Sequence, residues 1–200
     1  MTLDLLDWRR RVAAIYAEVR AGARSDPEGT LERFRAARDA LFATHSQSPL
    51  PVEARDDFKG LFYAPYDGDL RFDVDVDTSA EPVAFGITSS AEEAMRLTRF
   101  GRVELPIGSL DVYWIDVYGG GVFVPFRDTT AGDISYGGGR YLLDTVKGAD
   151  LGGEDGRLVL DFNYAYHPSC FYDPRWSCPL APPGSRLDCR VAAGELSRPL

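Results

Sequence analysis

Reactive side chains lie close together in an aromatic, proline-rich stretch near the end of the chain. The stretch reads DFNYAYHPSCFYDPRWSCPLAPPGSRL from Asp161 to Leu187, and it holds His167, Cys170 and Cys178, which are one of the two histidines and two of the three cysteines. An imidazole and thiolates can ligate zinc or form a nucleophilic pair, and two thiols can form a disulfide. The stretch is therefore either a structural cross-link, made by a disulfide or a metal, or the wall of a site.

The spacing of these residues favours some of these roles over others. Structural zinc sites usually contain two pairs of ligands two to four residues apart, whereas His167 and Cys170 make one such pair, even if Cys178 and Cys189 complete the set. We therefore expect no metal. In a reducing compartment the favoured state is two reduced thiols packed as small hydrophobes. There are two alternatives. One is a Cys170–Cys178 disulfide, and the other is a His167–Cys170 dyad in which the imidazole lowers the pKa of the thiol.

A second constellation is the glycine-rich loop YGGGRY, from Tyr136 to Tyr141. Consecutive glycines expose backbone N–H groups that can cradle an anion, and Arg140 adds a guanidinium fork. The spacing matches neither of the two glycine-rich nucleotide-binding motifs. Arg140 either faces an anionic ligand or pairs with an internal carboxylate, and Asp161 is the expected partner because it lies on a buried strand face.

The expected site lies where this loop, the strand end at Asp161 and the proline-rich stretch meet. Asp128 and Tyr136 are the candidate catalytic residues, because a general base beside a carboxylate clamp is the minimum for proton transfer on a small acid. The alternative role for Asp128 is turn formation. The expected ligand-binding residues are Tyr136, Gly138, Gly139, Arg140, Asp161, Asn163, Tyr166 and His167.

Two helices precede these residues. Apolar residues recur at three-to-four spacing from Leu3 to Arg20, and Gly22 ends that helix. A cap followed by a first-turn proline, at residues 25–28, opens a second amphipathic helix. The sequence therefore predicts a helical hairpin over residues 1–45, with its arginines and glutamates mainly on the solvated faces.

The pattern changes to alternation after a linker at residues 46–51. LRFDVDVD, from Leu70 to Asp77, alternates strictly and predicts a half-buried strand. Gly119-Gly120-Gly121 predicts a tight hairpin turn. Further strands are expected at residues 83–88, 100–107, 110–118, 121–126 and 157–165, and a short helical turn is expected at residues 90–97.

Short strands with short turns between them predict a mostly β fold, an antiparallel sandwich or barrel, on which the helical hairpin packs. We expect residues 46–200 to form this β domain. Prolines between residues 168 and 183 rule out regular structure there, so this segment should be an irregular cover over one end of the domain. A pocket is expected beneath such a cover.

Composition limits the expected partners. A formal charge of −9 argues against nucleic acid, because phosphate binding needs clustered Lys and Arg. The first residues lack the apolar run of a signal peptide, and no segment approaches the ~20 apolar residues of a membrane span. We expect a cytoplasmic protein with no membrane partner. Composition leaves the cofactor and the oligomeric state open.

The last third of the chain resembles a known family. FVPFRDTTAGDISYGGGRYL, from Phe123 to Leu142, the stretch from Asp161 to Leu187 and the closing RVAAGE are similar to a prokaryotic family, domain of unknown function 1684. The resemblance runs from about residue 110 to residue 195 and implies no established activity. The family pattern has Asn at the position of His167 and an aliphatic residue at that of Cys189, which argues against zinc.

These observations predict an uncharacterised protein that binds, or binds and converts, an anionic small molecule in a pocket around Arg140. The alternative is a non-catalytic structural or interaction module, in which the polar cluster only locks the C-terminal cover. Loss of Arg140 would abolish ligand binding in the first case. In the second it would lower stability alone.

Overall fold

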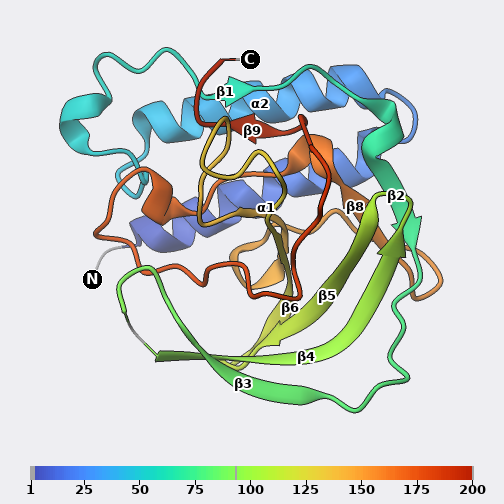
Figure 1. Cartoon of the computed structure of the whole chain (residues 1–200). Coiled ribbons are helices and arrows are strands. Elements are labelled where there is room, and N and C mark those ends of the chain that lie inside the picture. Colours follow the sequence, from blue (N-terminus) through green and yellow to red (C-terminus); the bar gives the residue numbers. More distant parts are fainter. Residues whose placement is uncertain (1–2, 93, 200) are drawn as a thin grey trace.

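The structure is a computed structural model that describes residues 3–92 and 94–199. Two N-terminal helices are followed by antiparallel sheets, which confirms the predicted mostly β fold with a helical hairpin (Figure 1). The strands make an open, sandwich-like arrangement rather than a closed barrel, because the two edge strands of the largest sheet are not paired with each other.

The helical hairpin consists of α1, Asp4–Gly22, and α2, Pro27–Thr44. Asp26 caps α2 by accepting a hydrogen bond from the backbone N–H of Gly29 at 3.1 Å. One stripe of each helix is buried, and it comprises Tyr16, Val19, Thr30, Leu31, Phe34, Leu41 and Phe42. Within the described residues, neither helix is apolar enough over a sufficient length to cross a membrane.

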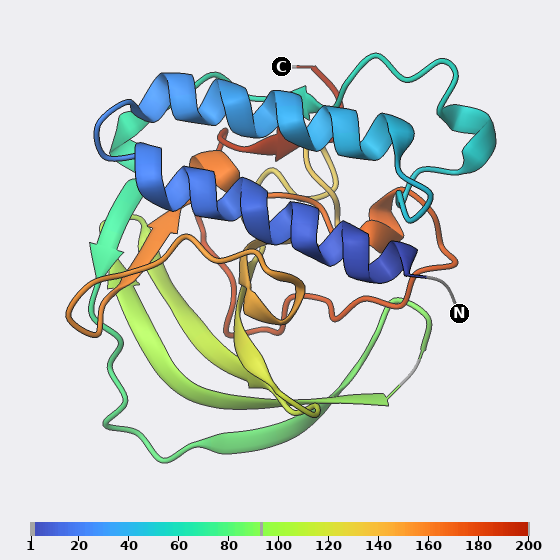
Figure 2. The same ribbon diagram turned by 180° about the vertical axis from the view of Figure 1, so that it is seen from behind.

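The largest sheet is an antiparallel meander whose strand order follows the chain. Its strands are β3 (Val83–Thr88), β4 (Ala94–Leu105), β5 (Gly108–Ile115), β6 (Gly121–Phe126) and β7 (Arg140–Asp144). The bounds of β3 and β6 are those predicted. The β5–β6 turn uses Gly119 and Gly120 at φ 85° and 51°, which confirms the glycine hairpin. Figure 2 shows the strong curvature of this sheet below the helices.

The predicted helical turn at residues 90–97 is wrong. Residues from Ala94 onward belong to β4, where Ala94 pairs with Thr88 and Leu97 pairs with Phe85. The local residues favour a helix, but pairing with β3 gives these residues a ladder of backbone hydrogen bonds, and Leu97 is completely buried. Tertiary pairing therefore overrides local propensity here.

Two short strand pairs join distant parts of the chain. They are β1 (Phe62–Tyr63) with β9 (Glu195–Leu196), and β2 (Arg71–Val74) with β8 (Leu158–Asp161). The strand predicted at residues 157–165 therefore ends at Asp161. The chain continues as a 3-10 turn over Phe162–Tyr164.

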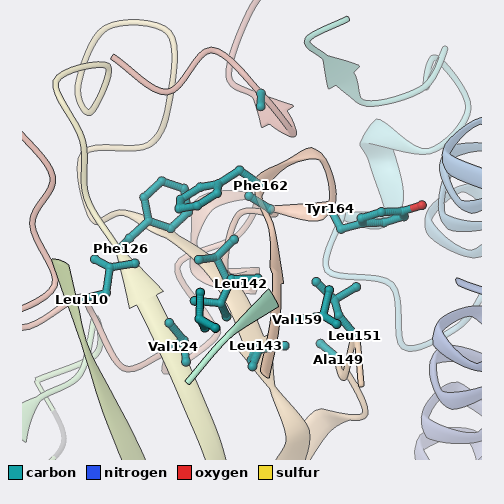
Figure 3. Close-up of a cluster of buried hydrophobic side chains, with 14 of the residues drawn as sticks. Leu110, Val124, Phe126, Leu142, Leu143, Ala149, Leu151, Val159, Phe162 and Tyr164 are labelled. Atoms are coloured by element: carbon teal, nitrogen blue, oxygen red, sulfur yellow. The ribbon is translucent and has the colours of Figure 1, made fainter. Parts of the chain in front are cut away.

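Apolar side chains from the large sheet and from the segment after β8 form the main core (Figure 3). Phe126 and Phe162 are fully buried and meet edge to face with ring centroids 5.0 Å apart. Tyr164 meets Phe34 of α2 at 4.9 Å in the same way. This second contact packs the helical hairpin against the β domain.

The C-terminal cover, residues 165–194, has no regular strand, as its prolines predicted. It is tied to β7 where Tyr141 and Tyr166 exchange backbone hydrogen bonds of 2.9 and 3.1 Å. The cover then returns to the hairpin side of the molecule, where β9 pairs with β1.

Candidate functional site

Arg140 is buried at the start of β7, with 1% of its surface exposed. Its Nη2 donates to Asp128 Oδ1 at 3.2 Å and to Val191 O at 2.8 Å. Its Nη1 donates to Ala193 O at 2.5 Å and to Glu195 O at 3.3 Å. The guanidinium therefore binds carbonyls of the C-terminal cover and β9 as well as one carboxylate.

The Asp128 carboxylate completes the same cluster from the other side. Its Oδ2 accepts from the backbone N–H of Val191 at 2.8 Å, and its Oδ1 accepts from the Thr130 hydroxyl at 2.9 Å. Asp128 thus fixes the loop after β6 to the end of the cover. We refer to Asp128, Arg140 and the backbone of residues 191–195 as the tail lock.

The prediction that Arg140 pairs with Asp161 is wrong, because Asp128 lies beside it at the end of the neighbouring strand β6. The expectation of an anion-accepting pocket around Arg140 is corrected as well. Both terminal nitrogens are bonded to protein and the side chain is enclosed, so a ligand anion has no path to it. The geometry matches the alternative in which the polar cluster locks the cover.

The glycines of the 136–141 loop allow close packing rather than forming an open cradle. A Cβ on Gly139 would lie 2.6 Å from Phe126 O, and its φ is +98°. A Cβ on Gly138 would lie 2.4 Å from the Tyr136 ring and 3.0 Å from Leu180. The loop must therefore lack side chains at these positions to pack against β6 and the cover.

Asp161 and Asn163 lie in a different place from Arg140. Asp161 Oδ1 accepts from the backbone N–H and the side-chain Nδ2 of Asn163 at 2.9 and 2.8 Å. Asn163 in turn bonds the backbone N–H and carbonyl of Asp67 at 2.9 and 2.8 Å. Asp161 also borders a cavity of about 160 Å³ whose other charged residues include Arg20, Arg24 and Arg71. These arginines already pair with Asp150, Asp73 and Glu154.

Asp161→Asn should stabilise the fold at neutral pH. Burial raises the pKa of Asp161 from 3.8 to about 6, so the folded chain keeps this proton at pH values where the unfolded chain releases it. Wild-type stability must then fall as pH rises from about 4 to about 6 and level off above. Asparagine keeps the Oδ1 acceptor without the charge, so we expect a gain of about 1 to 3 kcal/mol at pH 7.5.

Urea denaturation of both proteins at pH 4 and pH 7.5 measures this effect. The gain should shrink towards zero at the lower pH. An equal difference at both pH values would show that ionisation of Asp161 is not its cause.

His167 belongs to a buried ionic network that includes α2. Its Nε2 accepts from the backbone N–H of Tyr136 at 3.1 Å, and its Nδ1 lies 3.2 Å from Glu195 Oε1. Arg38 Nη2 donates to Glu195 Oε2 at 2.8 Å. Because Nε2 accepts, Nδ1 is the protonated nitrogen and donates to Glu195. The side chains of His167 and Glu195 are 0% and 1% exposed.

These contacts leave His167 unsuited to the alternatives based on metal or on a catalytic dyad. Both ring nitrogens are engaged, with Tyr136 and Glu195, so neither faces Cys170 or Cys178 as a base or ligand. Across residues 3–92 and 94–199, the structure gathers no group of three or more His, Cys, Asp or Glu side chains suited to a metal ion. The tetrahedral arrangement of His167, Cys170 and Cys178 is therefore not formed.

The network forms one wall of a hollow between the helical hairpin and the β domain. The inner part is about 60 Å³, and its principal lining residues are Trp8, Tyr16, Arg38, Phe42, Tyr166 and His167. An outer part of about 80 Å³ adjoins it and adds Leu5, Arg9, Gln47 and Trp176. Trp8, Lys147 and Ser169 line both parts, so the two hollows are neighbours, and we call them together the hairpin groove.

Two hydrogen-bond donors of the inner groove have no acceptor among the described residues. The Tyr16 hydroxyl and Arg38 Nε are both fully buried atoms without a partner. Burial raises the pKa of Tyr16, so its hydroxyl keeps its proton and remains a donor. Buried donors normally have partners, because an unpaired one costs about 1–3 kcal/mol. The inner groove is thus polar at one end and aromatic along its walls.

The mouth of the groove carries positive charge. Lys147 and Arg9 line its outer part, and neither has an ion-pair partner among the residues that the structure describes. Farther in, Arg38 is neutralised by Glu195 and stacks over the rings of Phe42 and Tyr166 at 4.6 and 4.9 Å. The positive charges of the outer groove therefore favour a ligand with an anionic group, and the aromatic walls favour a ligand with an apolar body.

Sequence reasoning located Tyr166 and His167 at a site but missed Arg38 and Glu195. The hairpin arginines were expected mainly on solvated faces, whereas Arg38 turns inward because Glu195 of β9 lies 2.8 Å away. Trp8 and Trp176 gave a weak signal, since large aromatic rings near charged residues often line binding sites. The other predicted residues fall in four places: the tail lock, the Asp161 turn, the surroundings of Cys170, which include Tyr136, and the close-packed glycines Gly138 and Gly139.

Comparison with known proteins places this geometry in a family. The chain is similar to a solved structure, the solution NMR structure of the uncharacterised protein from gene locus rrnAC0354 of Haloarcula marismortui. The two share 37% sequence identity with a TM-score of 0.58, over 86% of this chain and 95% of that one. A search of curated proteins finds no match.

The family match extends the resemblance found in the last third of the sequence towards the N-terminus. A model of the family described as "Protein of unknown function (DUF1684)" matches residues 56–196, which include the tail lock, the C-terminal cover and Glu195. The chain belongs to the DUF1684 family of proteins of unknown function.

Proposed function

We propose that the hairpin groove binds a small amphipathic carboxylate, a molecule with one anionic head and a short aromatic or aliphatic body. The observation that carries this proposal is the pair of buried donors without acceptors, the Tyr16 hydroxyl and Arg38 Nε, in residues that line the inner groove. Two unpaired donors in the lining of one small hollow suit the oxygens of a carboxylate or a carbonyl. The head would enter past Lys147 and Arg9.

The walls and the size limit the body of the ligand. Rings of Trp8, Phe42 and Tyr166 line the inner groove, and Trp176 lines the outer part. The volumes of about 60 and about 80 Å³ are small beside drug-sized sites. A single ring or a short alkyl chain is therefore the expected size. Binding without catalysis is proposed, since both ring nitrogens of His167 are already bonded, one to Tyr136 and the other to Glu195.

The three tryptophans allow a sharp test by NMR. Trp8 and Trp176 line the groove, whereas Trp114 is 41% exposed on β5 and serves as an internal control. Titration of labelled protein with phenylacetate and with hexanoate should shift the indole signals of Trp8 and Trp176 and leave that of Trp114 unchanged. The neutral amides of the two acids should bind at least several-fold more weakly.

The two lysines of the chain provide a matched pair of variants. Lys147 lines the groove, and Lys59 is exposed away from it. Lys147→Ala should weaken carboxylate binding about fivefold, the effect of about 1 kcal/mol of attraction near a surface. Lys59→Ala should leave it unchanged. Equal shifts at all three indoles, no shift with either acid, or equal affinities of the two variants would contradict the proposal.

A second candidate function rests on the tail lock. Asp128 and Arg140 hold residues 191–195 entirely through buried contacts, which suits a structural or interaction module without chemistry. Under that alternative the groove takes no carboxylate and the Trp8 and Trp176 signals stay fixed in the titration.

A further inference from the structure

Cys170 and Cys178 form a close pair of thiols. The backbone N–H of Cys170 donates to Cys178 Sγ at 3.4 Å, which places the two residues side by side. The third cysteine, Cys189, lies apart, where its thiol donates to Ile107 O at 3.6 Å. Within the described residues, all three thiols are free. The pairing is therefore specific to Cys170 and Cys178.

The two thiols differ in exposure. Cys178 is 1% exposed, whereas Cys170 is partly exposed in a 3-10 turn, Ser169–Phe171. A reagent in solution reaches Cys170 first. The buried neighbour can then react only with Cys170 itself, which is the arrangement of an attacking thiol and a resolving thiol.

The surroundings of Cys170 favour its thiolate. The neighbouring Cys178 is the largest cause of the lowered pKa of Cys170, which falls from 9.0 to about 6 despite burial. The Tyr136 hydroxyl lies 3.9 Å from the Cys170 sulfur. The hydrogen bond with Cys170, together with burial, raises the pKa of Cys178. At neutral pH the nucleophilic sulfur is therefore the exposed one.

Backbone contacts hold Cys178 in position. Its N–H donates to the Ser90 hydroxyl at 3.0 Å, and its carbonyl accepts from the N–H of Ser90 at 2.9 Å. The Ser90 hydroxyl also donates to Trp176 O at 3.0 Å. Ser90, which follows β3, thus fixes the resolving thiol.

We propose that Cys170 and Cys178 are a reversible redox pair that is oxidised by a hydroperoxide. The Cys170 thiolate attacks the outer oxygen of the peroxide, the O–O bond breaks, and Cys170 becomes a sulfenic acid while an alcohol or water leaves. The Cys178 thiol then attacks the Cys170 sulfur, the S–O bond breaks and water leaves, giving the disulfide. A low-molecular-weight thiol restores both thiols by exchange and is itself oxidised to its disulfide. The pair is independent of the proposed ligand.

The first experiment treats fully reduced protein with one equivalent of hydrogen peroxide in the absence of other thiols. Free thiols should fall from three to one, the intact mass should drop by two hydrogen atoms, and peptide mapping should join Cys170 to Cys178. Dithiothreitol should reverse the change. Oxidation of Cys170 to sulfinic acid with Cys178 still reduced, or disulfide formation only after denaturation, would overturn the proposal.

Variants assign the roles of the two thiols. In Cys178→Ser, peroxide should leave a sulfenic acid at Cys170 that dimedone traps, because no resolving thiol remains. In Cys170→Ser, peroxide should consume neither remaining thiol at the wild-type rate. Cys189→Ser, which removes the cysteine outside the pair, should form the disulfide as the wild type does. Loss of the disulfide in Cys189→Ser would show that a different pair reacts.

The pH dependence of alkylation tests the activation of Cys170. Iodoacetamide should label it with a midpoint near pH 6, while Cys189, whose pKa burial raises, should react only in more alkaline solution. Tyr136→Phe removes one hydrogen bond and should move the Cys170 midpoint upward, with folding checked by circular dichroism. Equal labelling of Cys170 and Cys189 at pH 6.5 would show that Cys170 is not the activated thiol.

Discussion

Arg140→Ala is expected to lower the free energy of unfolding by about 3 to 5 kcal/mol. The substitution removes the partner of Asp128, whose side chain is 1% exposed, and leaves a carboxylate buried without its counter-charge. It also leaves the carbonyls of Val191 and Ala193 without the donors they use now. Urea denaturation followed by circular dichroism measures the loss.

The matched control is Arg157→Ala, which removes an exposed arginine that has no ion-pair partner among the described residues. It should change stability by less than about 0.5 kcal/mol. In a double-mutant cycle, Arg140→Ala combined with Asp128→Ala should cost less than the sum of the two single losses, because the second change removes the stranded charge. A loss below about 1 kcal/mol for Arg140→Ala would refute the tail lock.

Glu195→Ala is expected to cost a similar amount, about 3 to 5 kcal/mol at pH 7. Glu195 is fully buried between Arg38 and His167, so its loss leaves the guanidinium of Arg38 without a counter-charge on the inner side of α2. Burial alone would raise the pKa of Glu195, but the Arg38 guanidinium and His167 outweigh it and hold the pKa below its ordinary 4.5. The stabilisation is therefore present above pH 4.5 and fades as pH falls through the lowered pKa.

Urea denaturation at several pH values measures both the size of the stability loss in Glu195→Ala and its dependence on pH. The difference between wild type and Glu195→Ala should be largest near pH 7 and should shrink in more acidic solution, where the carboxyl becomes protonated. Glu53→Ala, at an exposed glutamate of the loop after α2, is the control and should show no such loss. A pH-independent difference would mean that packing, and not charge, accounts for the effect.

The elements of this fold were largely predictable from the sequence, because their signals are local. The capped start of α2 at Pro27, the bounds of β3 and β6, and the hairpin turn at Gly119 and Gly120 all follow from spacing or from glycine chemistry. The exceptions are Ala94–Leu97, which had helical residues but a partner strand, and β1, β7 and β9, where no strand was predicted. A local signal is reliable only where no long ladder competes with it.

The pairing of charged groups was much less predictable. Asp128 follows a buried strand and Asp161 ends another, and only the position of β6 beside β7 decides which one meets Arg140. Arg38 and Glu195 likewise lie at opposite parts of the chain, so neither residue alone indicates a network. The hairpin groove exists because these distant pieces come together. Among the predicted residues, Tyr166 and His167 line it since the cover brings them under α2.

The pairing of β9 with β1 has a consequence for how the protein is made. Arg38 of α2 and both residues of β1 leave the ribosome long before Glu195 and Leu196, their partners. Until those two residues emerge, Arg38 has no carboxylate partner and β1 has no partner strand. These contacts therefore form late in folding, because contacts between distant segments form slowly.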